Sequence, residues 1–200
     1  MSTWMIRTAI GGLLGFEYLN YLGVLHYTLT FSWLGLLLTG LSMWLLVELA
    51  SLVLKAKIGS PLPWPAMLFG AGGIYVDAVG DIGKYFARFG SYDQFAHFTI
   101  TGLVAGLFVW FFWMLQKHGH FPAGSFFLVA TAFLVANLLG MLYEIEEYLE
   151  DYFTGSHRLG DGPDTANDLL LNLLGAFFAC GILYLWRVRN AKINLRKAES

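Results

Sequence analysis

Polar residues divide the chain into six long apolar stretches, each long enough to cross a bilayer core, which takes about 20 helical residues. The predicted spans are 4–25, 31–54, 64–86, 95–115, 124–148 and 168–187. The run Pro61-Leu62-Pro63-Trp64-Pro65 ends any helix before it, because proline removes a backbone donor and disfavours a helical residue in front of it. We therefore predict an all-α, polytopic membrane bundle of about six transmembrane helices. A single membrane domain covers 1–190, and a basic tail covers 191–200.

The composition narrows the class of protein further. Hydrophobic residues make up 57% of the 200 residues and charged residues only 13%, whereas a soluble domain carries about 25% charged residues. This excludes an ordinary soluble or disordered chain. A net charge of −2 argues against nucleic acid as a partner, and a single cysteine, Cys180, excludes a disulfide scaffold.

The basic residues predict the orientation, because lysine and arginine accumulate on the cytoplasmic side of membrane proteins. In a six-span topology, nine of the twelve lie on the side that holds both termini; they are Arg7, Lys55, Lys57, Lys117, Arg187, Arg189, Lys192, Arg196 and Lys197. The other three are Lys84, Arg88 and Arg158. We therefore expect a multi-pass membrane protein with cytoplasmic N- and C-termini.

The acidic residues have the opposite distribution. Eleven of the fourteen lie between Asp77 and Asp168, and simple alternation of the spans brings them all to the outer membrane face. Ionisable groups inside a membrane are costly and usually face the interior of the bundle. The carboxylates of four helices should therefore point toward one another near the outer surface.

Helical spacing selects candidate site residues from this group, because residues three or four apart share a helix face. Asp93 and His97 are four apart, and Glu144 and Glu147 are three apart, with Asn137 seven residues before Glu144. On the sixth span the residues that share one face are Asp164, Asp168 and Asn172. We predict that these faces surround one cavity.

Other acidic residues are expected to have ordinary roles. Glu146 lies off the face of Glu144 and should point to solvent or lipid headgroups. Glu150 and Asp151 are predicted to form a solvated helix end. Glu17 lies in the middle of the first predicted span and needs a polar partner, either Asn20 or a polar group on another helix.

The predicted cluster carries more negative charge than nearby basic residues can balance. Shared protons, pairing with Lys84, Arg88 or Arg158, and a bound cation are the three solutions. Mixed oxygen and imidazole ligands suit zinc or manganese better than calcium. The candidate metal ligands are Asp93, His97, Glu144 and Asp168. The chain contains no HExxH, P-loop, GxSxG or CxxC motif.

Pairs of small residues spaced by four allow helices to approach closely in lipid. Gly102 and Gly106 form one such pair, and we expect both to face a neighbouring helix. Gly11 and Gly15 form another.

Three sequence motifs resemble those of a known family. They are Tyr92-Asp93-Gln94-Phe95-Ala96-His97-Phe98, Tyr143-Glu144-Ile145-Glu146-Glu147-Tyr148 and Gly160-Asp161-Gly162-Pro163-Asp164-Thr165-Ala166-Asn167-Asp168-Leu169, the last followed by Asn172 and Gly175-Ala176. In this order they resemble the YjdF-type bacterial inner-membrane proteins and are more distantly similar to VanZ-like proteins. The resemblance covers about residues 90–180 and implies a small polytopic protein of the cell envelope.

Three functions remain open at this point. In the first, the outward pocket binds or processes a lipid or lipid-linked headgroup. An enzyme of this kind would use Glu144 or Glu147 as a general base, with His97 and Asp93 orienting substrate or metal. Asp164, Asp168, Asn172 and Asn137 would then bind the substrate. The alternatives are a small proton-coupled transporter, although carriers usually place their site near the midplane, and a non-catalytic membrane assembly protein.

Overall fold

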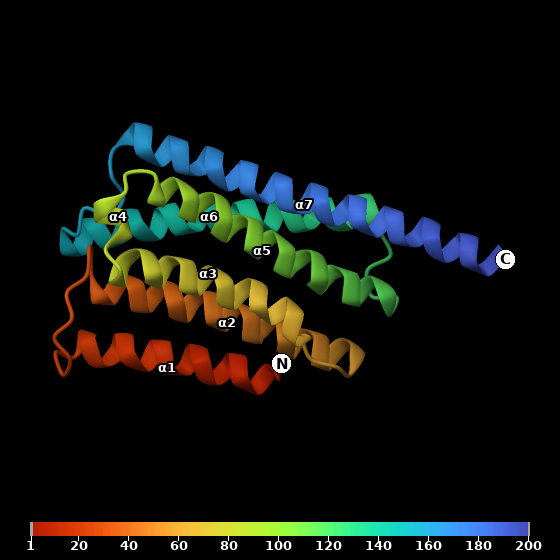
Figure 1. Cartoon of the computed structure of the whole chain (residues 1–200), viewed down its shortest axis with the longest axis horizontal. Helices are drawn as coiled ribbons and strands as arrows, with labels where there is room; N and C mark the ends of the chain where they lie inside the picture. The colour runs from red at the N-terminus through yellow and green to blue at the C-terminus, as the bar shows by residue number, and fades with distance from the viewer. Residues whose placement is uncertain (1, 200) are drawn as a thin grey trace.

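The structure, a computed structural model, is entirely helical over the residues it describes, which are 2–199 for the backbone and 2–190 for the side chains. Its helices are α1 (Thr3–Tyr21), α2 (Trp33–Ile58), α3 (Trp64–Ile82), α4 (Tyr85–Arg88), α5 (Tyr92–Lys117), α6 (Ser125–Thr154) and α7 (Gly162–Glu199). Six are long and run roughly side by side, whereas α4 is a single turn (Figure 1). The all-α membrane bundle is therefore confirmed. The side chains of the predicted tail, 191–200, lie outside the described residues.

The six long helices coincide with the six predicted spans, and four of them are long and apolar enough to cross a membrane by themselves. These four are α2, α5, α6 and the part of α7 from Gly162 to Asn190. The other two, α1 and α3, have 19 residues each. Polar residues, including Glu17 in α1 and Asp77 in α3, lower the mean hydropathy of both helices.

Local sequence sets where the helices end. The Ser32 hydroxyl accepts a hydrogen bond from Gly35 N at the start of α2, and Gly59 ends that helix with a φ of 74°, a conformation that glycine adopts without steric cost. Pro63 precedes α3, as the proline-rich run predicts. The helix α6 continues to Thr154, so Glu150 and Asp151 lie close to its C-terminal end.

Glu17 corrects the sequence interpretation. Because α1 ends at Tyr21, Glu17 lies close to the end of the helix rather than in the middle of a span. It is 0% exposed, and neither of its carboxylate oxygens has a hydrogen-bond partner. The Asn20 side chain instead donates to Phe16 O and accepts from Tyr27 N. The expected partnership with Asn20 is therefore wrong.

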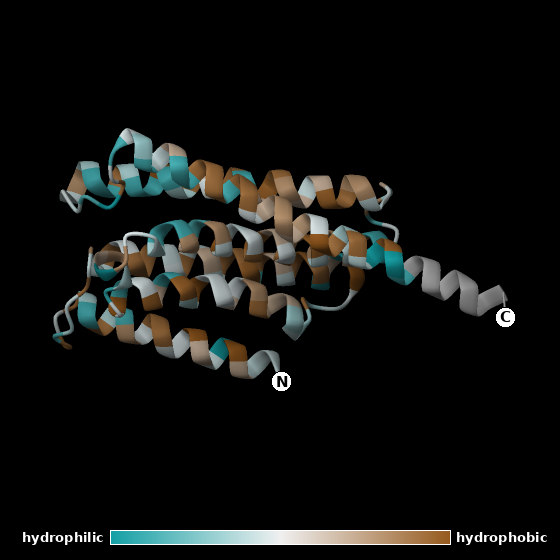
Figure 2. Cartoon of the chain, turned by 45° about the horizontal axis from the view of Figure 1, so that its top comes forward, coloured by the Kyte–Doolittle hydropathy of each residue, from teal (hydrophilic) through white to brown (hydrophobic). Residues whose placement is uncertain are grey.

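The long helices alternate in direction, so the connections gather at two ends of the bundle. One end, here called the acidic end, holds the connections 22–32, 83–91 (with α4) and 155–161; the other holds the first residues of α1 and the far end of α7 (Figure 1). Hydrophilic residues are concentrated toward the acidic end, whereas the middle of the bundle is mainly hydrophobic (Figure 2).

The helix α5 belongs to both hydrophobic clusters of the core. Its Leu107 joins the cluster formed with α1, α2 and α3. Its Val104 and Phe108 join the cluster formed with α6 and α7. A side chain at the acidic end of α5 is therefore held between the two halves of the bundle.

Close approach of α5 and α7 depends on glycine. A Cβ on Gly102 would lie 3.2 Å from Gly175 O, and a Cβ on Gly175 would collide with the backbone of Phe98. A Cβ on Gly106 would lie 2.7 Å from the Phe69 ring of α3. Both members of the Gly102–Gly106 pair thus face a neighbouring helix, as predicted. Gly11 and Gly15 have no such neighbour within 4 Å.

We predict that Gly102→Leu destabilises the protein, because the new side chain meets backbone atoms that cannot rotate away. Overpacking of this kind costs about 1–3 kcal/mol. Thermal unfolding in detergent measures the effect. The control is Gly181→Leu on α7, because nothing lies within 4 Å of the Cβ position there. Equal unfolding temperatures for the two variants would contradict the contact.

Candidate carboxylate–histidine site

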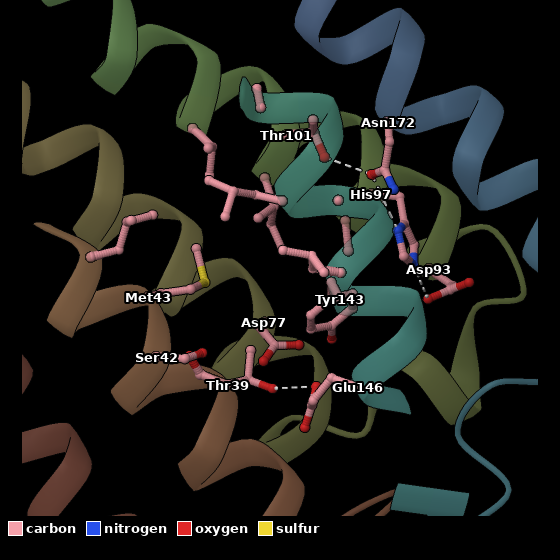
Figure 3. Close-up of a pocket in the computed structure, with 18 of the residues that line it drawn as sticks. Thr39, Ser42, Met43, Asp77, Asp93, His97, Thr101, Tyr143, Glu146 and Asn172 are labelled. Carbon is pink, nitrogen blue, oxygen red and sulfur yellow. Dashed lines mark hydrogen bonds and ion pairs between the residues drawn. The ribbon is translucent and has the colours of Figure 1, made fainter. Parts of the chain in front are cut away.

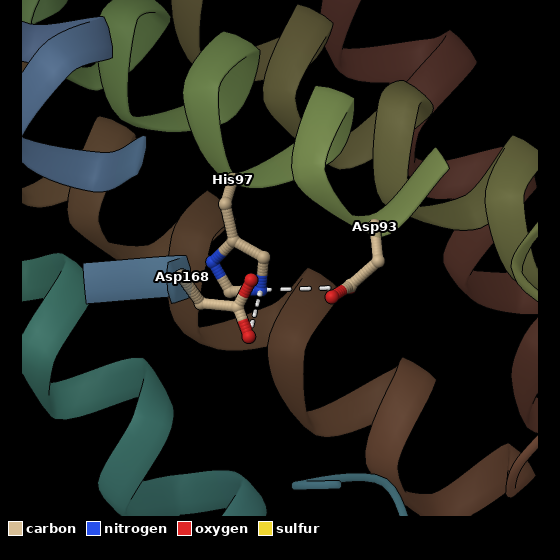
Figure 4. A group of neighbouring side chains, drawn as sticks. All are labelled: Asp93, His97 and Asp168. Carbon is tan, nitrogen blue, oxygen red and sulfur yellow. Dashed lines mark ion pairs between the residues drawn. The ribbon is translucent and has the colours of Figure 1, made fainter. Parts of the chain in front are cut away.

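His97 is the centre of a polar cluster at the acidic end, and its two ring nitrogens face different groups. Its Nε2 lies 3.5 Å from Asp93 Oδ1 and 3.9 Å from Asp168 Oδ2, and Figure 4 shows both carboxylates on that side of the ring. Its Nδ1 lies 3.4 Å from Glu144 Oε1 and 3.3 Å from Asn172 Oδ1. The cluster therefore joins α5, α6 and α7.

Asn172 is held in place by its neighbours. The Thr101 hydroxyl donates a hydrogen bond of 2.6 Å to Asn172 Oδ1, so this oxygen is available to accept a second hydrogen bond from His97 Nδ1 (Figure 3). Gly140 on α6 provides the space, because a Cβ there would lie 2.9 Å from Asn172 Nδ2. An imidazole that donates from Nδ1 leaves the lone pair of Nε2 free.

Two carboxylates of this cluster are buried without full compensation. Glu144 is 4% exposed and Asp168 is 3% exposed. Neither oxygen of Glu144 has a hydrogen-bond partner, and Oδ1 of Asp168 also has none. Among the described side chains, no lysine or arginine forms an ion pair with Asp93, Glu144 or Asp168. His97 is the only basic side chain that pairs with these carboxylates in the described part of the chain.

A second polar cluster lies beside the first and is centred on Arg158, from the 155–161 connection. Arg158 Nε lies 2.8 Å from Glu147 Oε1, and its other nitrogens lie 3.5 Å from Asp77 and 3.6 Å from Glu150. It also donates to the Tyr143 hydroxyl. Burial alone would lower the pKa of Arg158, but Tyr143, Asp77 and Glu147 raise it well above its usual value. The guanidinium therefore stays charged.

Other residues of the acidic end support the second cluster. Asp151 accepts hydrogen bonds from Ser156 Oγ, Arg158 N and Leu159 N, which orders the connection that carries Arg158. Glu150 accepts from the Ser32 hydroxyl at the start of α2. The expectation of a solvated helix end is therefore wrong for Glu150, which is 8% exposed, whereas Asp151 lies in the last turn of α6 and is only partly buried.

A cavity of about 340 Å³ adjoins both clusters. Its polar lining residues near the acidic end are Thr39, Asp77, Asp93, His97, Tyr143 and Glu146. Its deeper part is lined mainly by Met43, Leu46, Ile100, Val104, Ala136 and Leu139. Figure 3 shows side chains of α2 on one side of the cavity and side chains of α6 and α5 on the other. The cavity thus changes from polar to apolar along its length.

The structure brings five predicted site residues together, namely Asp93, His97, Glu144, Asp168 and Asn172. Glu147 lies at the boundary between the clusters and pairs with Arg158. Asn137 donates to Phe133 O of its own helix, and Asp164 is exposed in the first turn of α7. These last two do not join the cluster.

Sequence reasoning missed several residues of the region. Glu146 was expected to face solvent or headgroups, but it is half-buried, lines the cavity and accepts a hydrogen bond from Thr39. Arg158 was considered only as one of three possible basic partners, although it is the only lysine or arginine between Lys117 and Arg187, a segment rich in carboxylates. Tyr143 and Thr101 carried no signal of this kind.

A family model for predicted membrane proteins, designated DUF2238, matches residues 18–189. The chain belongs to this family. The YjdF-type resemblance agrees with the assignment, because DUF2238 is the YjdF family, whereas the more distant similarity to VanZ-like proteins stays a prediction. Comparison with curated proteins and with solved structures found no significant match. The assignment and the apolar helices together make this DUF2238 member a multi-pass membrane protein.

We predict that Arg158→Gln strongly destabilises this DUF2238 protein, because Asp77 and Glu147 would stay buried without their cation. Breaking a buried ion pair in this way costs about 3–5 kcal/mol. Unfolding in detergent by heat or denaturant measures the loss. Arg88→Gln is the matched control, since Arg88 is exposed and forms no described ion pair. A similar stability for both variants would show that Arg158 is not a structural centre.

Proposed function

We propose that this DUF2238 protein binds an amphipathic lipid, or a lipid-linked compound of the cell envelope, in the cavity between α2, α5 and α6. The headgroup would lie beside Asp77, His97 and Glu146, and the hydrocarbon chain would lie along Met43, Ile100 and Leu139. The polar-to-apolar change along the cavity carries this proposal. Pockets for small ligands commonly combine an apolar lining with a few polar groups that fix orientation.

The packing around the cavity supports access from the membrane. Both α2 and α6 pack against α5, and their direct contacts with each other are at the acidic end, where Thr39 donates to Glu146 and Ser32 to Glu150. Lipid would enter between α2 and α6, with its headgroup remaining at the level of the acidic end. A water-soluble substrate would not need the apolar part of the cavity.

The arrangement of charge supports an outward-facing site in the bacterial cytoplasmic membrane. The acidic end carries the polar part of the cavity and most carboxylates, whereas Arg7, Lys55, Lys57 and Lys117 belong to the opposite half of the bundle. Because basic residues favour the cytoplasmic side, the acidic end would face outward and both termini would be cytoplasmic.

The position of Glu17 weakens the transporter alternative. A carrier usually has its site near the membrane midplane, and Glu17 was the acidic residue expected there. It instead lies one turn from the end of α1, on the side of the acidic end. No specific observation favours the assembly-protein alternative.

Lipid retention tests the proposal. We expect the wild-type protein, purified in mild detergent, to retain a lipid that native mass spectrometry detects. Leu139→Trp should lower the occupied fraction several-fold, because the larger ring fills the apolar part of the cavity. The control is Leu138→Trp on the adjacent position, which is 51% exposed and does not line the cavity. Equal retention by both variants would exclude this cavity as the lipid site.

Cysteine labelling tests the orientation. In a variant without Cys180, a cysteine in place of the exposed Thr154 should react with an impermeant reagent added to intact cells or spheroplasts. A cysteine in place of the exposed Lys57, at the opposite end, should react only after the membrane is opened. The reverse pattern would place the acidic end in the cytoplasm and contradict an outward-facing site.

A further inference from the structure

We propose that Asp93, His97 and Asp168 bind a divalent cation, zinc or manganese, through His97 Nε2 and one oxygen of each carboxylate. These three ligand atoms all lie within 4.8 Å of one another. The inference extends the proposed function, because an open position on the cation would face the headgroup. Cation binding itself is measured without lipid, so either proposal can fail alone.

The distances in the cluster suit ligands around a cation better than hydrogen bonds. Side-chain hydrogen bonds to a nitrogen are about 2.7–3.2 Å long, whereas Nε2 is 3.5 Å from Asp93 Oδ1 and 3.9 Å from Asp168 Oδ2. Tetrahedral zinc, with ligands at about 2.0–2.2 Å, keeps its ligand atoms roughly 3.3–3.6 Å apart. A small closing movement would therefore complete the site.

The other side of the ring prepares His97 as a ligand. Metal-binding histidines usually donate their second N–H to a carboxylate or carbonyl oxygen, which fixes the tautomer and the ring orientation. Here Asn172 Oδ1, held by Thr101, and Glu144 Oε1 both face Nδ1. Glu144, the fourth residue predicted as a metal ligand, thus lies on the orienting side of the ring.

Charge supplies the independent reason for a cation. Asp168 and Glu144 are more than nine-tenths buried, have unpartnered oxygens and pair with no described lysine or arginine. Carboxylates buried without compensation are costly. A divalent cation at Nε2 would neutralise Asp93 and Asp168 directly, and three protein ligands would leave one position open, as in catalytic zinc sites.

A rival set of ligands shares His97 but fits less well. His97, Glu144 and Glu147 also bring ligand atoms within 4.8 Å of one another. However, Glu147 Oε1 already accepts a hydrogen bond of 2.8 Å from Arg158 Nε. A cation there would lie beside a buried guanidinium and would be repelled by it.

The test uses the full-length protein in detergent, freed of lipid, stripped with a chelator and then titrated separately with zinc and manganese. We expect one of the two cations to bind at one per chain, measured by elemental analysis and by competition with a chelating dye. Asp93→Asn and Asp168→Asn should each weaken binding about tenfold or more, as changes at metal sites do. Asp93 is the more informative position, because its side chain is 36% exposed and its replacement leaves the core intact.

Two control variants locate the cation. Glu147→Gln removes a member of the rival set, and His118→Gln removes an exposed histidine at the opposite end. Both should bind the cation as the wild type does. Loss of binding in Glu147→Gln with retention in Asp93→Asn would assign the cation to the rival set and overturn the proposal. Absence of stoichiometric cation binding by the wild type would also overturn it. That result would leave the outcome of the lipid-retention experiment, including the loss expected for Leu139→Trp, unchanged.

Discussion

A carboxylate in a membrane bundle must be turned away from lipid and compensated, and this constraint organises the acidic end of the protein. The structure satisfies it in two ways. Around Arg158, buried carboxylates surround one permanently charged guanidinium. Around His97, three carboxylates share one imidazole, and two of them, Glu144 and Asp168, retain unpartnered buried oxygens. The first cluster contains its own cation and stabilises the fold, whereas the second contains no lysine or arginine among the described side chains and has the capacity to bind a ligand.

Helix packing determines the geometry of the second cluster. The close approach at Gly102 and Gly175 lets α7 lie against α5, and this places Asp168 and Asn172 beside His97. The space at Gly140 admits the Asn172 side chain between α6 and α7. Small residues that allow helices to approach in lipid therefore also position the polar groups. The cavity lies between α2, α5 and α6, and it shares Asp93, His97 and Asn172 with the cluster.

Much of this arrangement could be predicted from the sequence, because the helical period and the alternation of spans are regular. They placed Asp93 with His97 and brought Glu144 and Asp168 to the same end. Prediction failed where a role depends on a loop or on exact helix ends. Arg158 was one of three basic residues considered as partners, because it lies in a connection whose path the sequence does not specify. Glu150 was expected to be solvated because α6 was predicted too short. Glu17 was misplaced because of the opposite error at a helix end, since α1 is shorter than the predicted span.

The central claim is that His97 is held between an orienting side and a ligand-binding side, and nuclear magnetic resonance of the ring nitrogens tests it most directly. The protein would be labelled with ¹⁵N-histidine and loaded with zinc, which is diamagnetic, and the His97 signals would be assigned by their absence in His97→Gln. The account predicts a hydrogen on Nδ1 and a zinc-bound Nε2 without one. A hydrogen on Nε2 in the presence of zinc would contradict it.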